Sequence, residues 1–153
     1  MANQSWLMKC EPAAYTIEEL ERDGTTGWEG VRNFQARNFL LQMKKGDLAI
    51  FYASSADPSG ATGIAEVVRE AYPDPTALRK GHEYFEPKAT RENPIWVAVD
   101  IGFVERFPRV VPIGELRSTP GLETMVILRK GSRLSVTPVT AGELRIVRRL
   151  GRG

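Results

Sequence analysis

Trp28 lies between two glycines in the segment Gly27-Trp28-Glu29-Gly30, and polar side chains follow it closely. An aromatic face beside amide and guanidinium groups is what stacking and edge recognition of an exposed nucleobase require. A large ring in a glycine-flanked turn is poorly explained as part of a helix or strand core. The pattern therefore favours a base-binding site with Trp28 as a stacking surface. The polar residues that follow it are Arg32, Asn33, Gln35, Arg37 and Asn38.

Two further aromatic residues could complete such a site. Apolar residues alternate from 95 to 103, which places Trp96 on the strand face opposite Ile95. Tyr52 closes an apolar run and precedes a polar loop. Stacking contributes about 1–3 kcal/mol per base, so two rings could offset the cost of unstacking one base. The alternative is that Trp28 and Trp96 cover an apolar seam between a helix and a sheet, since tryptophan is mostly buried.

Residue types suited to catalysis or metal binding are scarce. The chain has one cysteine, Cys10, and one histidine, His82, which excludes an internal disulfide and any site with two imidazoles. A Cys10–His82 thiol pair would need the fold to bring two distant residues together. The glycine-rich stretch at 60–63 lacks the Lys-Ser/Thr pair of a phosphate-binding loop. We therefore predict no metal, no cofactor and no catalytic residues.

Charge is distributed unevenly over the 153 residues. The net charge is +2, but residues 105–153 carry ten basic and four acidic side chains and the rest of the chain is net negative. A basic C-terminal third suits a polyanionic partner, with Arg129, Lys130 and Arg133 as candidate phosphate contacts. The alternative is that the arginines near the C-terminus form only the solvated face of a last helix.

The elements that must position these residues follow from periodicity and from start and stop signals. Residues 33–45 have helical spacing of apolar side chains, and Gly46 is suited to end the helix. Capping boxes at Thr16 and Thr140 predict a short helix to about residue 22 and a last helix closed by Gly151. Further helical turns are expected near 76–80 and at 113–117, and a short strand or helical turn at 125–128. Strands are expected at 6–8, 48–53, 61–69, 95–107 and 134–136, and a turn-rich segment at 23–30.

Together these elements indicate one α+β domain built on a small, curved sheet or partial barrel. The strands do not alternate strictly with helices, which argues against a parallel βαβ fold. Four prolines bracket an irregular stretch before residue 95, and a loop that long is usually functional. No apolar run approaches the ~20 residues of a membrane span, and no secretory signal is visible. We therefore expect a cytosolic or nuclear protein.

Several segments resemble, in order along almost the whole chain, the EVE domain family. The most specific is Trp28-Glu29-Gly30-Val31-Arg32-Asn33-Phe34-Gln35-Ala36-Arg37-Asn38. The others are Trp6-Leu7-Met8-Lys9-Cys10-Glu11-Pro12, Gly63-Ile64-Ala65-Glu66-Val67-Val68, Ala71-Tyr72-Pro73-Asp74, Asn93-Pro94-Ile95-Trp96 and Arg133-Leu134-Ser135-Val136-Thr137-Pro138-Val139-Thr140.

The resemblance implies a single PUA-like domain over residues 1–153, with a small mixed β-barrel of about five to six strands surrounded by helices. This fold is related to the YTH and SRA readers of modified bases. It also implies non-enzymatic binding of DNA or RNA, with a modified base held in an aromatic-lined pocket. Cys10 departs from many relatives, which carry a serine whose hydroxyl can donate to a base. The implied pocket residues are Lys9, Cys10, Trp28, Val31, Arg32, Asn33, Arg37, Asn38, Tyr52 and Trp96.

Two other functions stay open on the sequence. Some PUA-like relatives are proposed nucleases or hydrolases, and Lys9 with Glu11 could supply an acid and a base. The pocket could also be vestigial in a domain that binds other proteins. Rings and amides suffice for binding, whereas little is present to activate water, so we expect a reader rather than an enzyme. Its expected partner is nucleic acid with a modified base, with no membrane and no metal, in the cytoplasm (or the nucleus of a eukaryote).

Overall fold

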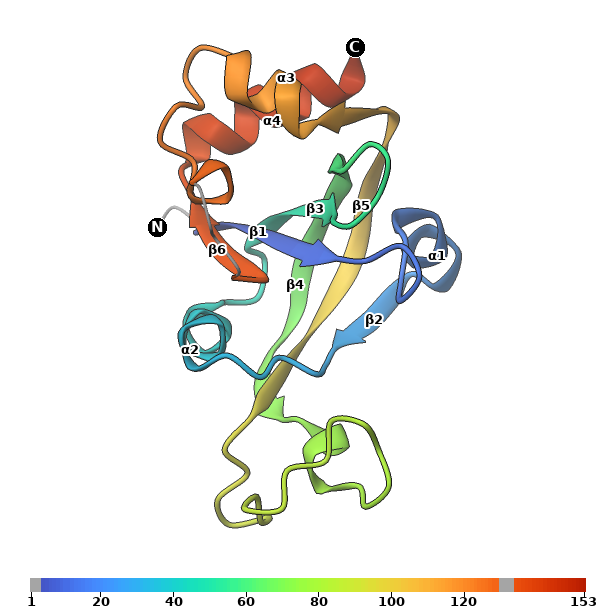
Figure 1. The fold of residues 1–153 in the computed structure, drawn as a ribbon, viewed down its shortest axis with the longest axis vertical. Coiled ribbons are helices and arrows are strands. Elements are labelled where there is room, and N and C mark those ends of the chain that lie inside the picture. Colours follow the sequence, from blue (N-terminus) through green and yellow to red (C-terminus); the bar gives the residue numbers. More distant parts are fainter. Residues whose placement is uncertain (1–3, 130–133) are drawn as a thin grey trace.

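The computed structural model describes residues 4–129 and 134–153, which contain one six-stranded mixed sheet (Figure 1). The strand order is β2-β5-β4-β3-β1-β6; β1 and β3 are parallel and all other neighbours are antiparallel. The strands are β1 (Ser5–Cys10), β2 (Thr25–Trp28), β3 (Leu48–Ala53), β4 (Gly60–Pro73), β5 (Val97–Pro112) and β6 (Val136–Val139).

The expected α+β class is confirmed, but the sheet is not closed into the expected barrel. Within the described residues, β2 and β6 each pair on one side only and so form the two edges of the sheet. The helices are α1 (Ile17–Asp23), α2 (Phe34–Gln42), α3 (Ile113–Ser118) and α4 (Ala141–Arg152), with 3₁₀ turns η1 (Pro75–Leu78) and η2 (Val126–Leu128).

Helix boundaries follow the predicted signals with two differences. The capping boxes at Thr16 and Thr140 are both formed. α2 ends at Gln42, earlier than expected, because the Asp47 carboxylate accepts a hydrogen bond from the backbone N–H of Lys44 and holds the chain in a turn. α4 runs through Gly151 instead of ending there. A β-carbon at Gly151 would lie 2.3 Å from the ring of Phe107, so this glycine serves close packing.

The strands differ from expectation mainly at β2. Residues 25–28 were expected in a turn, yet they pair with β5 from Val99 to Gly102. Thr25 and Thr26 are β-branched and favour a strand, a signal that the neighbouring glycines obscured. At the start of β5, Ile95 has φ +64°, which an extended strand does not allow, so the strand begins at Val97.

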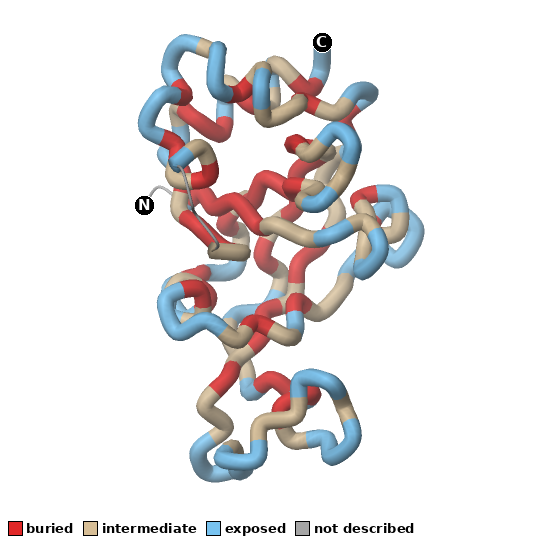
Figure 2. The backbone as a smooth tube through the Cα atoms, in the orientation of Figure 1, coloured by how far each residue is buried: buried red, intermediate tan, exposed pale blue. Residues whose placement is uncertain are grey.

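Side-chain alternation along the central strands produces two cores, one on each face of the sheet. Trp6 and Phe51 belong to the core that packs against α1 and α2, whereas Leu7 and Tyr52 belong to the core under α3 and α4. This is the two-residue period of a strand that is buried on both faces. Buried residues, red in Figure 2, therefore run through the centre of the molecule.

Residues 74–96, between β4 and β5, extend beyond the sheet at the end opposite α3 and α4 (Figure 1). Apart from the turn η1, this segment has no regular secondary structure. The expected helical turn near 76–80 is η1, and the proline-bracketed loop is therefore a separate layer at one end of the molecule. In the described residues, no helix is both long and apolar enough to span a bilayer.

Candidate nucleic-acid interface

A cavity of about 700 Å³ lies where β1 and β2 end and where the 74–96 segment folds back toward them. The volume is within the range typical of small-molecule sites, which is about 300–1,000 Å³. Half of the site residues expected from the sequence line it: Lys9, Cys10, Trp28, Val31 and Arg32.

The other five expected residues lie outside the cavity. Asn33 is the N-cap of α2 and accepts a hydrogen bond from the backbone N–H of Ala36. Arg37 and Asn38 follow on the same helix. Tyr52 is 2% exposed and lies in the core under α3 and α4, because strand alternation turns it to the face opposite Phe51. The fifth is Trp96, which is buried between other side chains.

Trp28 is at once a wall of the cavity and a member of the core. Its side chain is 8% exposed, and its ring meets Phe51 edge-on with 5.9 Å between centroids. The interpretation that this ring lies in a turn outside the core is wrong, because residues 25–28 form a strand whose last side chain points inward. The surface that Trp28 offers a ligand is therefore only a small part of its ring.

The structure adds cavity residues that the sequence patterns did not single out. Tyr84, His82 and Glu83 come from the 74–96 segment, and Tyr15 comes from the approach to α1. Tyr84 is the most informative of them, since 40% of its side chain is exposed. The length of the proline-bracketed loop was the signal that pointed to this segment, although it did not identify the residues.

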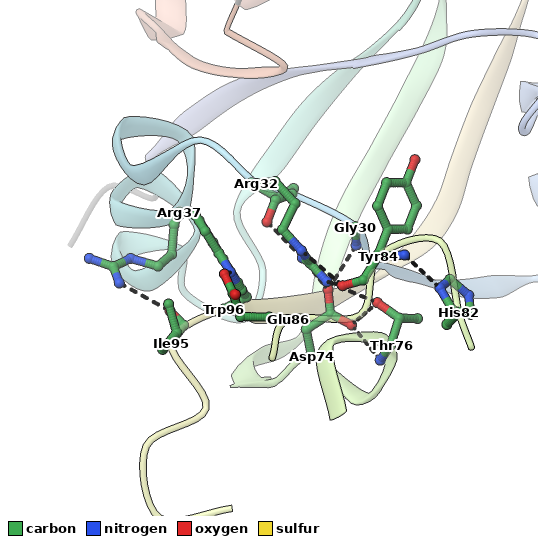
Figure 3. A network of polar contacts seen from close by, with 11 residues as sticks. Gly30, Arg32, Arg37, Asp74, Thr76, His82, Tyr84, Glu86, Ile95 and Trp96 are labelled. Atoms are coloured by element: carbon green, nitrogen blue, oxygen red, sulfur yellow. Dashed lines mark hydrogen bonds and ion pairs between the residues drawn. The ribbon is translucent and has the colours of Figure 1, made fainter. Parts of the chain in front are cut away.

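Arg32 fastens the 74–96 segment to the body of the protein (Figure 3). Its guanidinium donates to the Asp74 carboxylate at 3.0 Å and to the backbone carbonyl of Tyr84 at 2.7 Å. Asp74 is fully buried and also accepts hydrogen bonds from the backbone N–H of Gly30 and from Thr76. Burial opposes its ionisation, but the hydrogen bonds from Thr76, Gly30 and Arg32 outweigh this effect and lower the pKa of Asp74. Arg32 therefore positions the cavity wall, with its donors already engaged.

The cavity lining is rich in carboxylates. Glu11, Glu29 and Glu83 line it together with Lys9. Burial, reinforced by the negative charge of Asp74, raises the pKa of Glu29. A carboxylate in this setting can accept a hydrogen bond from the exocyclic amino group of a base.

Two other groups in the lining are uncharged at neutral pH. Burial raises the pKa of the Cys10 thiol, and the nearby carboxylate of Glu11 raises it further. Burial and a hydrogen bond to Asp23 raise the pKa of Tyr15 to about 12. The thiol and the phenol can therefore offer polar contacts to a ligand without adding charge.

A second hollow of about 420 Å³ near the start of α4 is lined, among described residues, by no aromatic ring and no basic side chain. No group of three His, Cys, Asp or Glu side chains within residues 4–129 and 134–153 is arranged to hold a metal ion.

The basic C-terminal third is partly committed to ion pairs. Arg148 and Arg152 both bind the carboxylate of Glu105, and Arg109 binds Glu115. These arginines thus serve the packing of α4 and α3 against β5. Among the candidate phosphate contacts, Arg129 is exposed just after η2, while Lys130 and Arg133 lie outside the described residues.

Comparison with known proteins gives the family. A model of the EVE domain matches residues 4–150. The chain belongs to the EVE domain family. It is 40% identical to human thymocyte nuclear protein 1 over 93% of this chain and 71% of the relative. The name of that relative associates it with the nucleus. The relative's name does not support a cytoplasmic location for this chain, so that location stays a prediction.

Solved structures of EVE domain relatives superpose closely on this one. The protein PSPTO5229 from Pseudomonas syringae is 48% identical, with a TM-score of 0.92 over 96% of this chain and 99% of that one. Human THYN1, solved in complex with DNA containing 5-methylcytosine, is 38% identical, with a TM-score of 0.89 over 98% of both chains.

A more distant structure shares only the fold. The YTH domain of the Zygosaccharomyces rouxii MRB1 protein, in complex with N6-methyladenosine RNA, is 13% identical. Its TM-score is 0.57 over 98% of this chain and 87% of that one.

Proposed function

We propose that this chain is a single EVE domain that binds nucleic acid without catalysing a reaction and holds a modified base in the cavity beside Trp28. The observation that carries the proposal is the cavity itself, where the rings of Trp28 and Tyr84 lie among polar groups. The complex of human THYN1 with DNA containing 5-methylcytosine supports the same function for this relative of the family.

The chemistry of the lining suits a base better than a phosphate. Aromatic surface at Trp28 and Tyr84 can contact a base face. The carboxylate of Glu29 can accept from an amino group of the base edge, as carboxylates do for cytosine. Lys9 supplies a cation at the end of β1, where a backbone phosphate could follow the base. A base can reach the cavity only after it leaves its stack, which is least costly in a single strand or at a damaged pair.

The fold likeness to the YTH domain supports a PUA-like assignment. We propose this assignment for the chain, in which the open six-stranded sheet corresponds to the small barrel of the PUA-like fold. The comparisons include one relative with DNA and one fold neighbour with RNA. Both nucleic acids therefore belong in the test of function.

A binding screen tests the proposal. Matched DNA and RNA oligonucleotides, each with one modified or unmodified base, are titrated against the protein by fluorescence anisotropy at fixed salt. We expect at least one modified base to bind more tightly than its unmodified counterpart. Equal affinity for every modified and unmodified pair would contradict base reading.

The contribution of Arg129 is tested in the same assay. If this exposed side chain contacts phosphate, Arg129→Ala weakens binding of all sequences equally and flattens the dependence of log affinity on log salt. Arg145→Ala on α4 is the matched control, since Arg145 is another exposed arginine of the basic C-terminal third and is not a candidate phosphate contact. An unchanged salt slope in Arg129→Ala would remove Arg129 from the interface.

A hydrolase is the competing function, because Lys9 and Glu11 both line the cavity. Mass spectrometry of each oligonucleotide after long incubation with the protein tests it. We expect no change in mass. Product formation that disappears in Lys9→Ala or Glu11→Gln would establish catalysis instead.

A further inference from the structure

Five side chains form a continuous stacked row from the cavity wall to the N-terminus of α2. The guanidinium carbon of Arg32 lies 5.4 Å from the ring centroid of Tyr84 on one side and 5.4 Å from that of Trp96 on the other. Trp96 stacks on Phe34 with 4.7 Å between centroids and 24° between planes. Arg37 completes the row, 4.8 Å from the Phe34 ring. Figure 3 shows Arg32 between Tyr84 and Trp96, with Arg37 farther along on the other side of Trp96.

The interior of the row is fixed by hydrogen bonds. The indole N–H of Trp96 donates to the carboxylate of Glu86 at 3.0 Å, and its carbonyl accepts from the backbone N–H of Asp74. Arg37 donates to the carbonyl of Ile95 at 3.0 Å, which holds that residue at φ +64°. A β-branched residue rarely adopts this conformation, so the contact constrains the backbone directly before Trp96.

Phe34 stays largely exposed, although Trp96 stacks on its ring and the Arg37 guanidinium lies over it. Its side chain is 58% exposed, although it is the first residue of α2 and packs on a buried tryptophan. If the Phe34 ring only covered Trp96, we would expect more of its surface to be buried. An exposed aromatic ring with rigid support and a neighbouring guanidinium is instead the arrangement of a base-stacking platform in single-strand binding proteins.

The occupant is determined by continuity with the cavity and by charge. Three contacts of 4.7 to 5.4 Å, through Arg32 and Trp96, connect the exposed rings of Tyr84 and Phe34. A few nucleotides span the distance between these two rings. Arg37 places a positive charge against the Phe34 ring, where a phosphate between two bases could lie. The cavity lining, in contrast, carries three glutamates.

We infer that Phe34 is a second base-stacking site, which takes a base that flanks the modified base on the same strand, with Arg37 beside it to meet the backbone phosphate. The inference rests on the proposed function, because the flanking base is brought to Phe34 by the base in the cavity. It also gives a role to Arg37, which the sequence placed in the site and the structure places outside the cavity.

The experiment compares a ligand with flanking bases and a ligand without them. The best-binding modified oligonucleotide from the screen and the corresponding free modified nucleoside are each titrated against Phe34→Ala. We expect the oligonucleotide to bind Phe34→Ala about 5- to 150-fold more weakly than it binds the unchanged protein, from the loss of one stacked base. We expect the affinity for the nucleoside to stay the same, because Phe34 does not line the cavity.

Two further variants isolate the ring. Phe34→Leu keeps apolar volume without an aromatic face and should lose as much affinity as Phe34→Ala, whereas Phe34→Tyr should restore it. Leu41→Ala is the matched control, since Leu41 is another exposed apolar side chain on α2, at 49%, but has no place in the row. A thermal unfolding curve for each variant shows that it is folded.

An abasic nucleotide at each flanking position locates the contact. One such position should weaken binding to the unchanged protein and leave binding to Phe34→Ala unaffected. The inference is overturned if Phe34→Leu binds the oligonucleotide as tightly as the unchanged protein does. Equal losses for nucleoside and oligonucleotide, or an equal loss in Leu41→Ala, would also overturn it. If the unchanged protein binds no modified ligand at all, the proposed function has failed before Phe34 is tested.

Discussion

The ring of Tyr84 packs so closely on Gly30 that a β-carbon at residue 30 would lie 2.6 Å from Cε2 of the ring. Gly30 also has φ +83°, a conformation that residues with a side chain rarely adopt. The contact places a residue of the 74–96 segment directly on the chain that follows β2. The position of the Tyr84 wall therefore depends on a glycine more than fifty residues away in sequence.

Gly30→Ala should displace this wall and weaken binding of the modified base. Gly24→Ala is the matched control, because Gly24 has the same φ of +83° and no atom within 4 Å of an added β-carbon. A side chain at a φ of +83° costs about 1–3 kcal/mol of stability in both variants, measured by urea unfolding. We expect a further loss of stability and a loss of affinity in Gly30→Ala alone. Equal behaviour of the two variants would show that the Tyr84 contact has no effect.

Arg32→Ala should destabilise the protein by about 3–5 kcal/mol, because it leaves the fully buried carboxylate of Asp74 without its cation. Arg22→Ala removes an arginine from an ion pair with Asp23 on the surface and should change stability little. Urea unfolding of both variants measures the difference. A small effect of Arg32→Ala would mean that Thr76 and Gly30 alone stabilise the buried charge.

Acid should selectively weaken the Asp74 contacts. The pKa of Asp74 is lower in the folded protein than in the unfolded chain, so its ionised form stabilises the fold above its ordinary pKa. This stabilisation is lost as the pH falls through the folded pKa. The difference in unfolding free energy between the unchanged protein and Asp74→Asn should therefore shrink as the pH falls below about 4, the ordinary pKa of an aspartate. A constant difference over this range would contradict the lowered pKa.

Trp28→Ala should cost about 3–5 kcal/mol of stability, because the side chain is buried against Phe51. This replaces the expectation from the sequence that Trp28 acts mainly on the ligand. Trp28→Phe keeps an aromatic ring in the core and should fold, while its smaller surface weakens binding of the modified base. Unfolding curves and nucleoside titrations measure the two effects separately. Unchanged nucleoside affinity in a folded Trp28→Phe would remove Trp28 from the ligand site.

Cys10 should react slowly with alkylating reagents at neutral pH, since burial raises the pKa of its thiol and the thiolate is the reactive form. The rate of iodoacetamide labelling, followed by mass spectrometry and compared with that of the urea-unfolded protein, measures this. Cys10→Ser should leave stability within about 1 kcal/mol, because the site is only half-buried and lined by polar groups. Fast labelling of the folded protein would favour a reactive thiol.

The sequence by itself determined the local elements and the residues at the ends of β1 and β2. Capping boxes at Thr16 and Thr140 and the alternation along β3 depend on neighbours within a few residues, so they could be predicted without tertiary information. The resemblance in the 28–38 block also identified the family that the comparisons show. Lys9 and Trp28 were expected in the site, and both line the cavity.

Tertiary structure alone decided which aromatic rings face a ligand. Tyr52 and Trp96 are aromatic like Tyr84 and Phe34, so residue type does not separate the buried pair from the exposed pair. Burial depends on which side chains from distant parts of the chain pack against each ring. The partners of Arg32 illustrate the reason: Asp74, Thr76 and Tyr84 lie 42 to 52 residues away. Contacts of this range form only when the 74–96 segment folds back on the sheet, and no local pattern encodes that geometry.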